Sequence, residues 1–122
     1  MSKIESHRDR LVWQKAMDLT VEVYRLTKSF PPFETYRLTG QLTRAAASVP
    51  ANIAEGNARG TRRDYASFLA VAKGSLMETE TFVMLAVRLG YLSQVEADPS
   101  LMLVTVSKML TGLRSRLLSS PG

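Results

Sequence analysis

Cysteine is absent from the 122 residues, which excludes a disulfide framework, a thiolate metal site and a cysteine nucleophile. That absence suits a reducing compartment, and we expect a cytoplasmic protein. Histidine occurs once, as His7, and bundles that hold two metal ions need paired Glu-x-x-His motifs. We therefore expect no metal site, no cofactor and no catalytic residues, and a protein that is not an enzyme.

Long apolar runs are also missing. The longest uncharged run, residues 82–87, is far too short to span a bilayer. The first ten residues are charged and no apolar run follows them directly, so we expect neither a secretory signal nor a membrane partner. With 45% hydrophobic and 22% charged residues, the composition predicts a single globular domain over residues 1–122.

Basic residues outnumber acidic ones by 16 to 11, which gives a net charge of +5 and a pI near 9.9. This balance favours polyanionic partners, although charge that merely prevents association is an equal alternative. The excess is spread along the chain, because residues 1–30 hold six basic and four acidic groups and each later quarter exceeds balance by one. There is no lysine-rich tail.

Apolar residues recur every three or four positions, which is the spacing of amphipathic helices. We expect four helices, at about 10–28, 34–58, 62–89 and 99–118. Prolines 31 and 32 end the first, Gly60 and Thr61 supply caps between the second and third, and Gly90 ends the third. Four helices with short connections predict an all-α fold, an antiparallel up-down-up-down four-helix bundle.

Several residues inside these helices call for special packing. Pro50 predicts a kink, with Ser48 bonding to a carbonyl group that the proline frees. Gly74 and Ser75 predict a close approach by another helix. The inward stripe of the fourth helix is expected at these positions: Met102, Val106, Met109, Leu113 and Leu117.

A polar row runs beside the apolar stripe of the second helix. Its members are Gln41, Arg44, Ser48, Asn52 and Glu55. We favour a buried network that fixes the register between helices or subunits, and ligand binding is the alternative. Pairing of Arg44 with carboxylates across helices is favoured over an ion site built from Glu55, Glu78 and Glu80.

A second apolar file, Trp13, Met17 and Tyr24, lies beside the inward stripe of the first helix. A helix packed on one core needs a single stripe, so the file predicts an oligomer interface. A broad stripe with a half-buried tryptophan is an equal alternative.

The turn between the second and third helices is the best candidate for contact with phosphate. Arg59, Arg62 and Arg63 lie within five residues, the last two at a helix start, and arginine forks match phosphate geometry. Lys15 is a weaker candidate. The alternative is an ordinary exposed turn. No aromatic residues interleave with the cations, so binding is expected to depend on backbone charge and on salt.

Four segments together resemble the four-helix-bundle family encoded within intervening sequences of bacterial 23S ribosomal RNA. They are Val12–Ala16, Tyr36–Gly56, Gly74–Glu78 and Leu89–Leu92. The resemblance covers about Leu11 to Leu118. This family is similar in turn to the accessory variability determinant of diversity-generating retroelements. The chain departs from the family pattern at Thr43, where a second arginine is common, and at 79–81.

The resemblance implies an antiparallel bundle that assembles as a ring, typically a homopentamer, with a role in binding nucleic acid. For the retroelement relative it also implies a reverse transcriptase partner. We therefore expect a non-enzymatic oligomer, an accessory factor that binds RNA or DNA through a distributed basic surface. A protein–protein interaction scaffold with no nucleic-acid role is the alternative.

Overall fold

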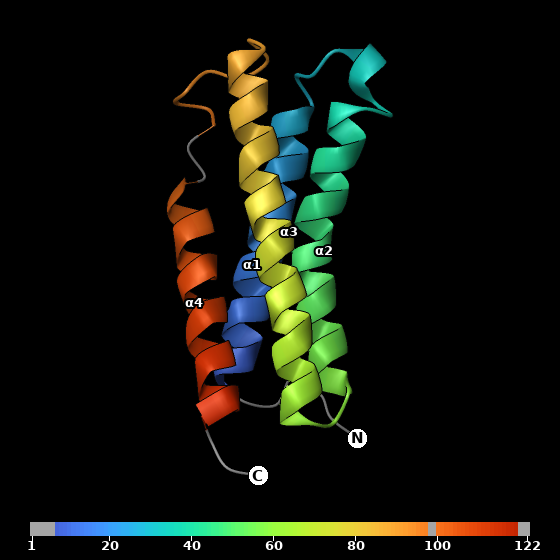
Figure 1. Ribbon diagram of the computed structural model, residues 1–122. Helices are drawn as coiled ribbons and strands as arrows, with labels where there is room; N and C mark the ends of the chain where they lie inside the picture. The colour runs from blue at the N-terminus through green and yellow to red at the C-terminus, as the bar shows by residue number, and fades with distance from the viewer. Residues whose placement is uncertain (1–6, 98–99, 120–122) are drawn as a thin grey trace.

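The computed structural model describes residues 7–97 and 100–119. The described chain forms the following elements: α1 (His7–Thr27), a 3₁₀ turn η1 (Pro32–Glu34), α2 (Leu38–Ala58), α3 (Arg62–Arg88) and α4 (Ser100–Ser119). Figure 1 shows the four helices side by side, with consecutive helices running in opposite directions. The described part of the chain contains no strand. The all-α four-helix bundle predicted from the sequence is confirmed.

Hydrogen bonds between α3 and α4 fix their antiparallel register. Arg62 Nε donates to the carbonyl oxygen of Leu117 over 3.3 Å, and Lys73 Nζ donates to Thr111 Oγ1 over 2.8 Å. The residue number therefore falls along α4 as it rises along α3. As a result, α4 ends beside the start of α3.

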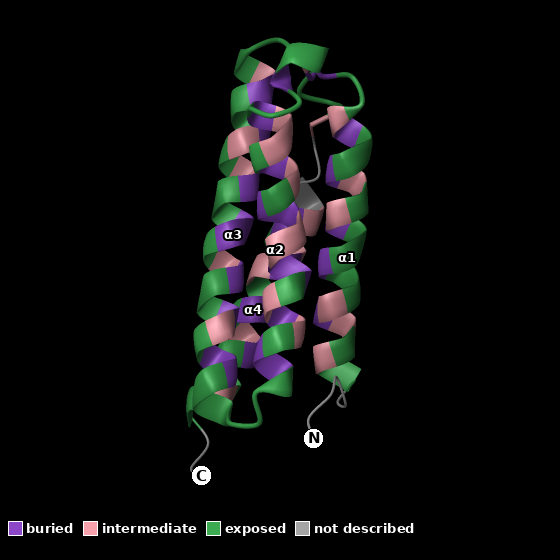
Figure 2. Cartoon of the chain, turned by 90° about the vertical axis from the view of Figure 1, so that its right-hand side faces the viewer, coloured by how far each residue is buried: buried purple, intermediate pink, exposed green. Residues whose placement is uncertain are grey.

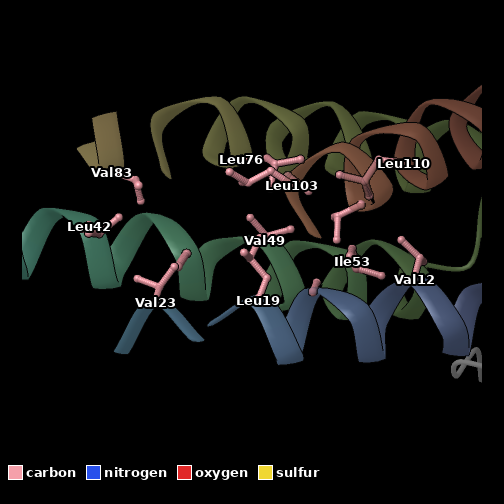
Figure 3. Close-up of a cluster of buried hydrophobic side chains, with 14 of the residues drawn as sticks. Val12, Leu19, Val23, Leu42, Val49, Ile53, Leu76, Val83, Leu103 and Leu110 are labelled. Atoms are coloured by element: carbon pink, nitrogen blue, oxygen red, sulfur yellow. The ribbon is translucent and has the colours of Figure 1, made fainter. Parts of the chain in front are cut away.

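The core lies along the axis of the bundle, where each helix turns one apolar stripe inward (Figure 2). Figure 3 labels ten of its buried side chains, which come from all four helices: Val12, Leu19, Val23, Leu42, Val49, Ile53, Leu76, Val83, Leu103 and Leu110. The expected stripes of the first three helices largely face this core. On α4 the expectation was partly wrong, because Leu103 and Leu110 are buried where Met102 and Met109 were expected.

Two helices begin away from their predicted starts. α1 begins at His7, three residues earlier than expected, and α2 begins at Leu38 rather than near Glu34. Pro31 and Pro32 favour a short 3₁₀ turn first, and Glu34 Oε1 then accepts a hydrogen bond from the Leu38 N–H over 3.2 Å. Glu34 thus serves as a cap for α2 instead of forming part of it.

Pro50 lies inside an uninterrupted α2 and is buried. A proline has no N–H, so it leaves the carbonyl oxygen of Ala46, four residues earlier, without its helical partner. The Thr20 hydroxyl of α1 lies 2.9 Å from the Ala16 carbonyl oxygen of its own helix and 3.1 Å from the Ala46 oxygen, so these two acceptors share its one proton. The expectation that Ser48 fills this role was wrong, because its hydroxyl bonds to Ser75 on α3 over 2.9 Å.

The turns at both ends of α3 follow the predicted chemistry. Gly60 has φ +93°, a left-handed conformation that suits glycine, and Thr61 Oγ1 accepts a hydrogen bond from the Asp64 N–H over 3.1 Å. Gly90 has φ +82° and takes part in the paired backbone bonds of a Schellman motif. The predicted cap of α4 at 98–99 lies outside the described residues.

Of the two small residues expected to mark a close approach, Ser75 contacts α2, because its hydroxyl lies 2.9 Å from that of Ser48, whereas Gly74 does not. Among the glycines, the close approach is at Gly56. A Cβ atom added at Gly56 would lie 2.6 Å from the Cβ of Phe68 and 3.0 Å from Tyr65 Cδ1. A Cβ atom added at Gly74 would meet nothing within 4 Å. α2 and α3 therefore come nearest to each other close to the turn that joins them.

Candidate nucleic-acid interface

Seven exposed arginines lie at one end of the bundle, where α1 begins, α2 turns into α3, and α4 ends (Figure 1). We call the following set the arginine end: Arg8, Arg10, Arg59, Arg62, Arg63, Arg114 and Arg116. Three acidic residues share these segments, Asp9, Glu55 and Asp64, which leaves a local net charge of +4. By contrast, segments 22–44 and 78–97 toward the other end hold five basic and five acidic residues.

Tyr65 joins the start of α1 to the start of α3 at this end. Its hydroxyl donates to Asp9 Oδ1 over 3.0 Å, and its ring packs beneath Gly56. Burial, reinforced by the charge of Asp9, raises the pKa of Tyr65 far above its ordinary value of 10.0. The hydroxyl therefore remains a donor over the whole physiological range, and the Asp9 carboxylate is engaged within the protein.

Three of the seven arginines are held by contacts within the bundle. Arg62 Nε and Arg114 Nε each donate to a backbone carbonyl group of the neighbouring helix, over 3.3 and 3.1 Å. Arg59 pairs with Glu55 over 3.2 Å and lies over the Phe68 ring, 4.9 Å from its centroid. These contacts fix the positions of the segments that form the arginine end.

The other four arginines have no partner in the described part of the chain. The side chains of Arg8, Arg10, Arg63 and Arg116 make no hydrogen bond or ion pair with any residue of the described ranges, 7–97 and 100–119. Their guanidinium groups are exposed, so an external anion can reach them without breaking a contact. They are the side chains of this end that are best placed to bind a ligand.

The structure therefore brings Arg59, Arg62 and Arg63 together with four arginines that the sequence reasoning missed. Lys15, the fourth predicted contact, does not join them. It faces α4 beside Asp18 and Thr105, further along α1. An up-down topology returns both chain ends to the 59–63 turn, and this was the signal that would have found the missing residues.

The polar row of α2 is less buried than expected. Asn52 Nδ2 donates to Ser48 Oγ over 2.8 Å, and Ser48 bonds to Ser75, so these half-buried or buried side chains link α2 to α3. Gln41, Arg44 and Glu55 are exposed. The network that fixes helix register consequently has its centre at Ser48 and not along the whole row.

Both ion pairs of the described residues lie within single helices, Glu22 with Arg25 and Glu55 with Arg59. The expected pairing of Arg44 across helices is therefore wrong. In residues 7–97 and 100–119 no three histidines, cysteines, aspartates or glutamates come together in a way that would hold a metal ion. No helix in the same ranges combines the length and apolar character needed to cross a membrane.

The predicted oligomer surface on α1 divides into two parts. Met17 and Tyr24 are 39% and 52% exposed, and Val21 between them is 55% exposed, so the three form an apolar row that faces solvent. Trp13 is half-buried and packs against the core of its own bundle. The broad-stripe alternative thus describes Trp13, and the partner-surface interpretation still fits the exposed row.

Fold and site together define a four-helix bundle whose cationic groups collect at one end. The family model of the 23S rRNA-intervening sequence protein matches residues 8–112, so the chain belongs to that family. The family resemblance expected from the sequence is confirmed, whereas the likeness to the retroelement protein stays a prediction.

A solved structure shares the fold. It is the crystal structure of a protein with unknown function from the S23 ribosomal protein family of Bacteroides thetaiotaomicron, with a TM-score of 0.67 and 23% identity. The match covers 92% of this chain and 96% of that chain. At this identity the likeness shows the common fold alone. The comparison with curated proteins gave no match.

Proposed function

We propose that this protein is a non-enzymatic accessory factor that binds the sugar–phosphate backbone of RNA or DNA through the arginine end. The observation that carries the proposal is the gathering of seven arginines from three distant segments. Four of these arginines have no partner among the described residues. The planar guanidinium group presents two parallel donors that match a phosphate group. Four such groups without a partner among the described residues favour a ligand with an array of phosphates over a single small anion.

The surroundings of the arginine end favour backbone contact over stacking on bases. Tyr65 is buried, and Phe68 is half-buried beneath Arg59, so neither ring of this end is free to stack. Arg62 and Arg63 also open α3, where backbone N–H groups and the helix dipole favour anions. Binding of this kind depends on counterion release and weakens steeply with salt.

Self-assembly, in the pentameric form that the family resemblance implied, belongs to the same proposal. The exposed row of Met17, Val21 and Tyr24 on α1 supports it, because a second subunit would remove these side chains from water. A closed ring would repeat the arginine end several times, and weak contacts would then act together. The reverse transcriptase partner and the cytoplasmic location remain predictions.

The alternative function is a protein-interaction scaffold. A groove of about 690 Å³ between α3 and α4 supports this second candidate. Gly74, Met77 and Leu118 contribute small or apolar surface to it, and Lys73 and Arg114 contribute the charge. A scaffold would use this groove and leave the unpaired arginines without a role.

Charge reversal separates the two functions. The double variant R63E/R116E changes two unpaired arginines and leaves Arg62, which holds α4, in place. We expect it to weaken the binding of a structured RNA hairpin and of duplex DNA at least tenfold. The slope of log Kd against the logarithm of the salt concentration should fall by about one for each phosphate group that the variant no longer neutralises.

The matched control is R44E/K108E, which makes the same change of charge at exposed residues outside the arginine end. It should retain most of the affinity and of the salt slope. Equal losses in both double variants would show that net charge, and not the arginine end, governs binding. Undiminished binding by R63E/R116E would reject the proposed interface and favour the scaffold.

A further inference from the structure

The connection between α1 and α2 lies at the end of the bundle opposite the arginine end (Figure 1), and it carries two exposed aromatic residues. Tyr36 is 93% exposed, the largest exposed fraction of any large hydrophobic side chain that the structure describes, and Phe33 is 64% exposed. The core therefore gains almost nothing from either ring. Two adjacent aromatic side chains that do not serve packing are typical of a surface that binds a ligand or a partner.

The backbone beneath these rings is held by three hydrogen bonds of the i→i+3 type. The N–H groups of Glu34, Thr35 and Arg37 donate to carbonyl oxygens three residues earlier, over 2.9, 3.1 and 2.9 Å. Phe33 and Tyr36 are three positions apart on this short connection, and both side chains are exposed there.

Glu34 fastens this turn to the rest of the bundle. Its Oε2 accepts a hydrogen bond from the Tyr91 hydroxyl over 2.7 Å, while its Oε1 caps Leu38. The Tyr91 ring in turn packs on Phe30, with 5.4 Å between the ring centroids. The turn is thus fixed at both of its ends, and a ligand would not have to order it.

Three cations at this end, Lys28, Arg37 and Arg88, are exposed, and their side chains make no hydrogen bond or ion pair within the described ranges. Two acids of this end are engaged internally. Glu34 receives two hydrogen bonds, and Glu96 accepts one from the Ser93 N–H over 2.9 Å. Exposed cations at the end that also carries flat, exposed rings suit a polyanion with planar groups.

We propose that Phe33 and Tyr36 stack on unpaired bases of a single-stranded nucleic acid, whose phosphates are bound by Lys28, Arg37 and Arg88. This aromatic end extends the proposed function and does not depend on the arginine end. The 27 residues of α3 run between the two ends, a length of about 40 Å at 1.5 Å per residue, so the two sites are separate. The protein therefore offers a backbone contact at one end and a base contact at the other.

The test compares single-stranded RNA with the duplex of the same sequence by fluorescence anisotropy. The probe is a fluorescein-labelled ten-nucleotide RNA of mixed sequence without self-complementarity. The double variant F33A/Y36A should lose at least about tenfold in affinity for the single strand, because each stacked ring contributes severalfold. Its affinity for the duplex should stay within twofold.

Two further variants separate stacking from plain apolar contact and from attraction by charge. F33L/Y36L keeps apolar side chains and removes the aromatic faces, so it should lose single-strand binding as the alanine variant does. R63E/R116E should show the opposite pattern, with duplex binding weakened and single-strand binding retained. If the unchanged protein and all variants fail to bind the duplex while the unchanged protein binds the single strand, the proposed function is rejected and the inference about the aromatic end is retained.

Three results would overturn the inference. One is equal single-strand affinity of F33A/Y36A and the unchanged protein, and another is full binding by F33L/Y36L, which would indicate apolar contact without stacking. The third is a change in assembly size for F33A/Y36A, measured by light scattering, which would make the rings a contact between subunits. Both rings are exposed, so the melting temperature should not change and misfolding should not obscure the result.

Discussion

One substitution, glycine to alanine, should have opposite effects at two positions of the same bundle. In a helix interior this change removes backbone freedom from the unfolded chain and stabilises by about 0.5–1 kcal/mol when the new methyl group has room. Gly74 of α3 has room, since nothing lies within 4 Å of an added Cβ atom. G74A should therefore raise the free energy of unfolding by about 0.5–1 kcal/mol.

At Gly56 the added methyl group would lie 2.6 Å from the Cβ of Phe68. Carbon atoms in contact stay about 3.5–4.0 Å apart, so α2 and α3 would have to separate by about 1 Å. A Cβ atom cannot move without its backbone, and overpacking of this kind costs about 1–3 kcal/mol or more. This cost exceeds the helix-propensity gain, and G56A should destabilise the protein by about 1–2 kcal/mol.

Urea unfolding followed by circular dichroism at 222 nm measures both variants. The protomer concentration must be the same throughout, because assembly makes apparent stability depend on it. The variants should differ by about 1.5–3 kcal/mol, with the unchanged protein between them. A stabilised G56A would refute the assigned helix contact, and a strongly destabilised G74A would show that its side of α3 is covered.

The remaining predictions concern single side chains. T20V should cost about 1–2 kcal/mol of unfolding free energy, since the buried carbonyl group of Ala46 would lose its donor, and T27V, which changes an exposed hydroxyl, should cost far less. The pKa of Glu34 lies below its ordinary value of 4.5, first because Tyr91 donates a hydrogen bond to its carboxylate. The ionised carboxylate therefore stabilises the folded protein above pH 4.5, and this stabilisation is lost as the pH falls through the lower pKa of the folded state. E34Q should flatten the loss of stability between about pH 5 and pH 3, and an unchanged acid profile would reject this role. E55A should change stability by less than about 0.5 kcal/mol, because its ion pair with Arg59 is exposed, and a larger loss in urea titrations would restore the buried-network interpretation.

The sequence alone was enough to predict the helices and most turns, because these depend on local chemistry. The three-and-four spacing of apolar residues defines a helix face, and Gly60, Thr61 and Gly90 have conformational roles that neighbouring residues determine. Boundaries shifted where local rules competed. At Pro31 and Pro32 the chain favours a 3₁₀ turn, which delays the start of α2 to Leu38.

The contacts between helices could not be predicted in the same way. Whether a glycine marks a close approach depends on where two helices cross. Gly74 and Gly56 both lie inside helices, and the sequence alone does not show that an added Cβ atom would clash at Gly56 and have room at Gly74. The side chain that reaches the carbonyl group freed by Pro50 is Thr20, which precedes Ala46 by 26 residues and lies on another helix. Such pairs appear only when the helices are placed beside one another.

The candidate site shows the same limit. Arg59, Arg62 and Arg63 are neighbours in the chain, and the sequence therefore predicted them as a group. Arg8 and Arg116 join them because the topology returns both ends of the chain to the same end of the bundle (Figure 1). A charge excess spread evenly over the sequence consequently becomes concentrated in the folded protein.

The salt dependence of RNA binding by R63E/R116E, beside R44E/K108E, tests the central claim most directly. The account predicts that reversing Arg63 and Arg116 at the arginine end lowers both the affinity and the salt slope, and that the same charge change outside this end leaves both nearly intact. Identical salt slopes for the two double variants would contradict it.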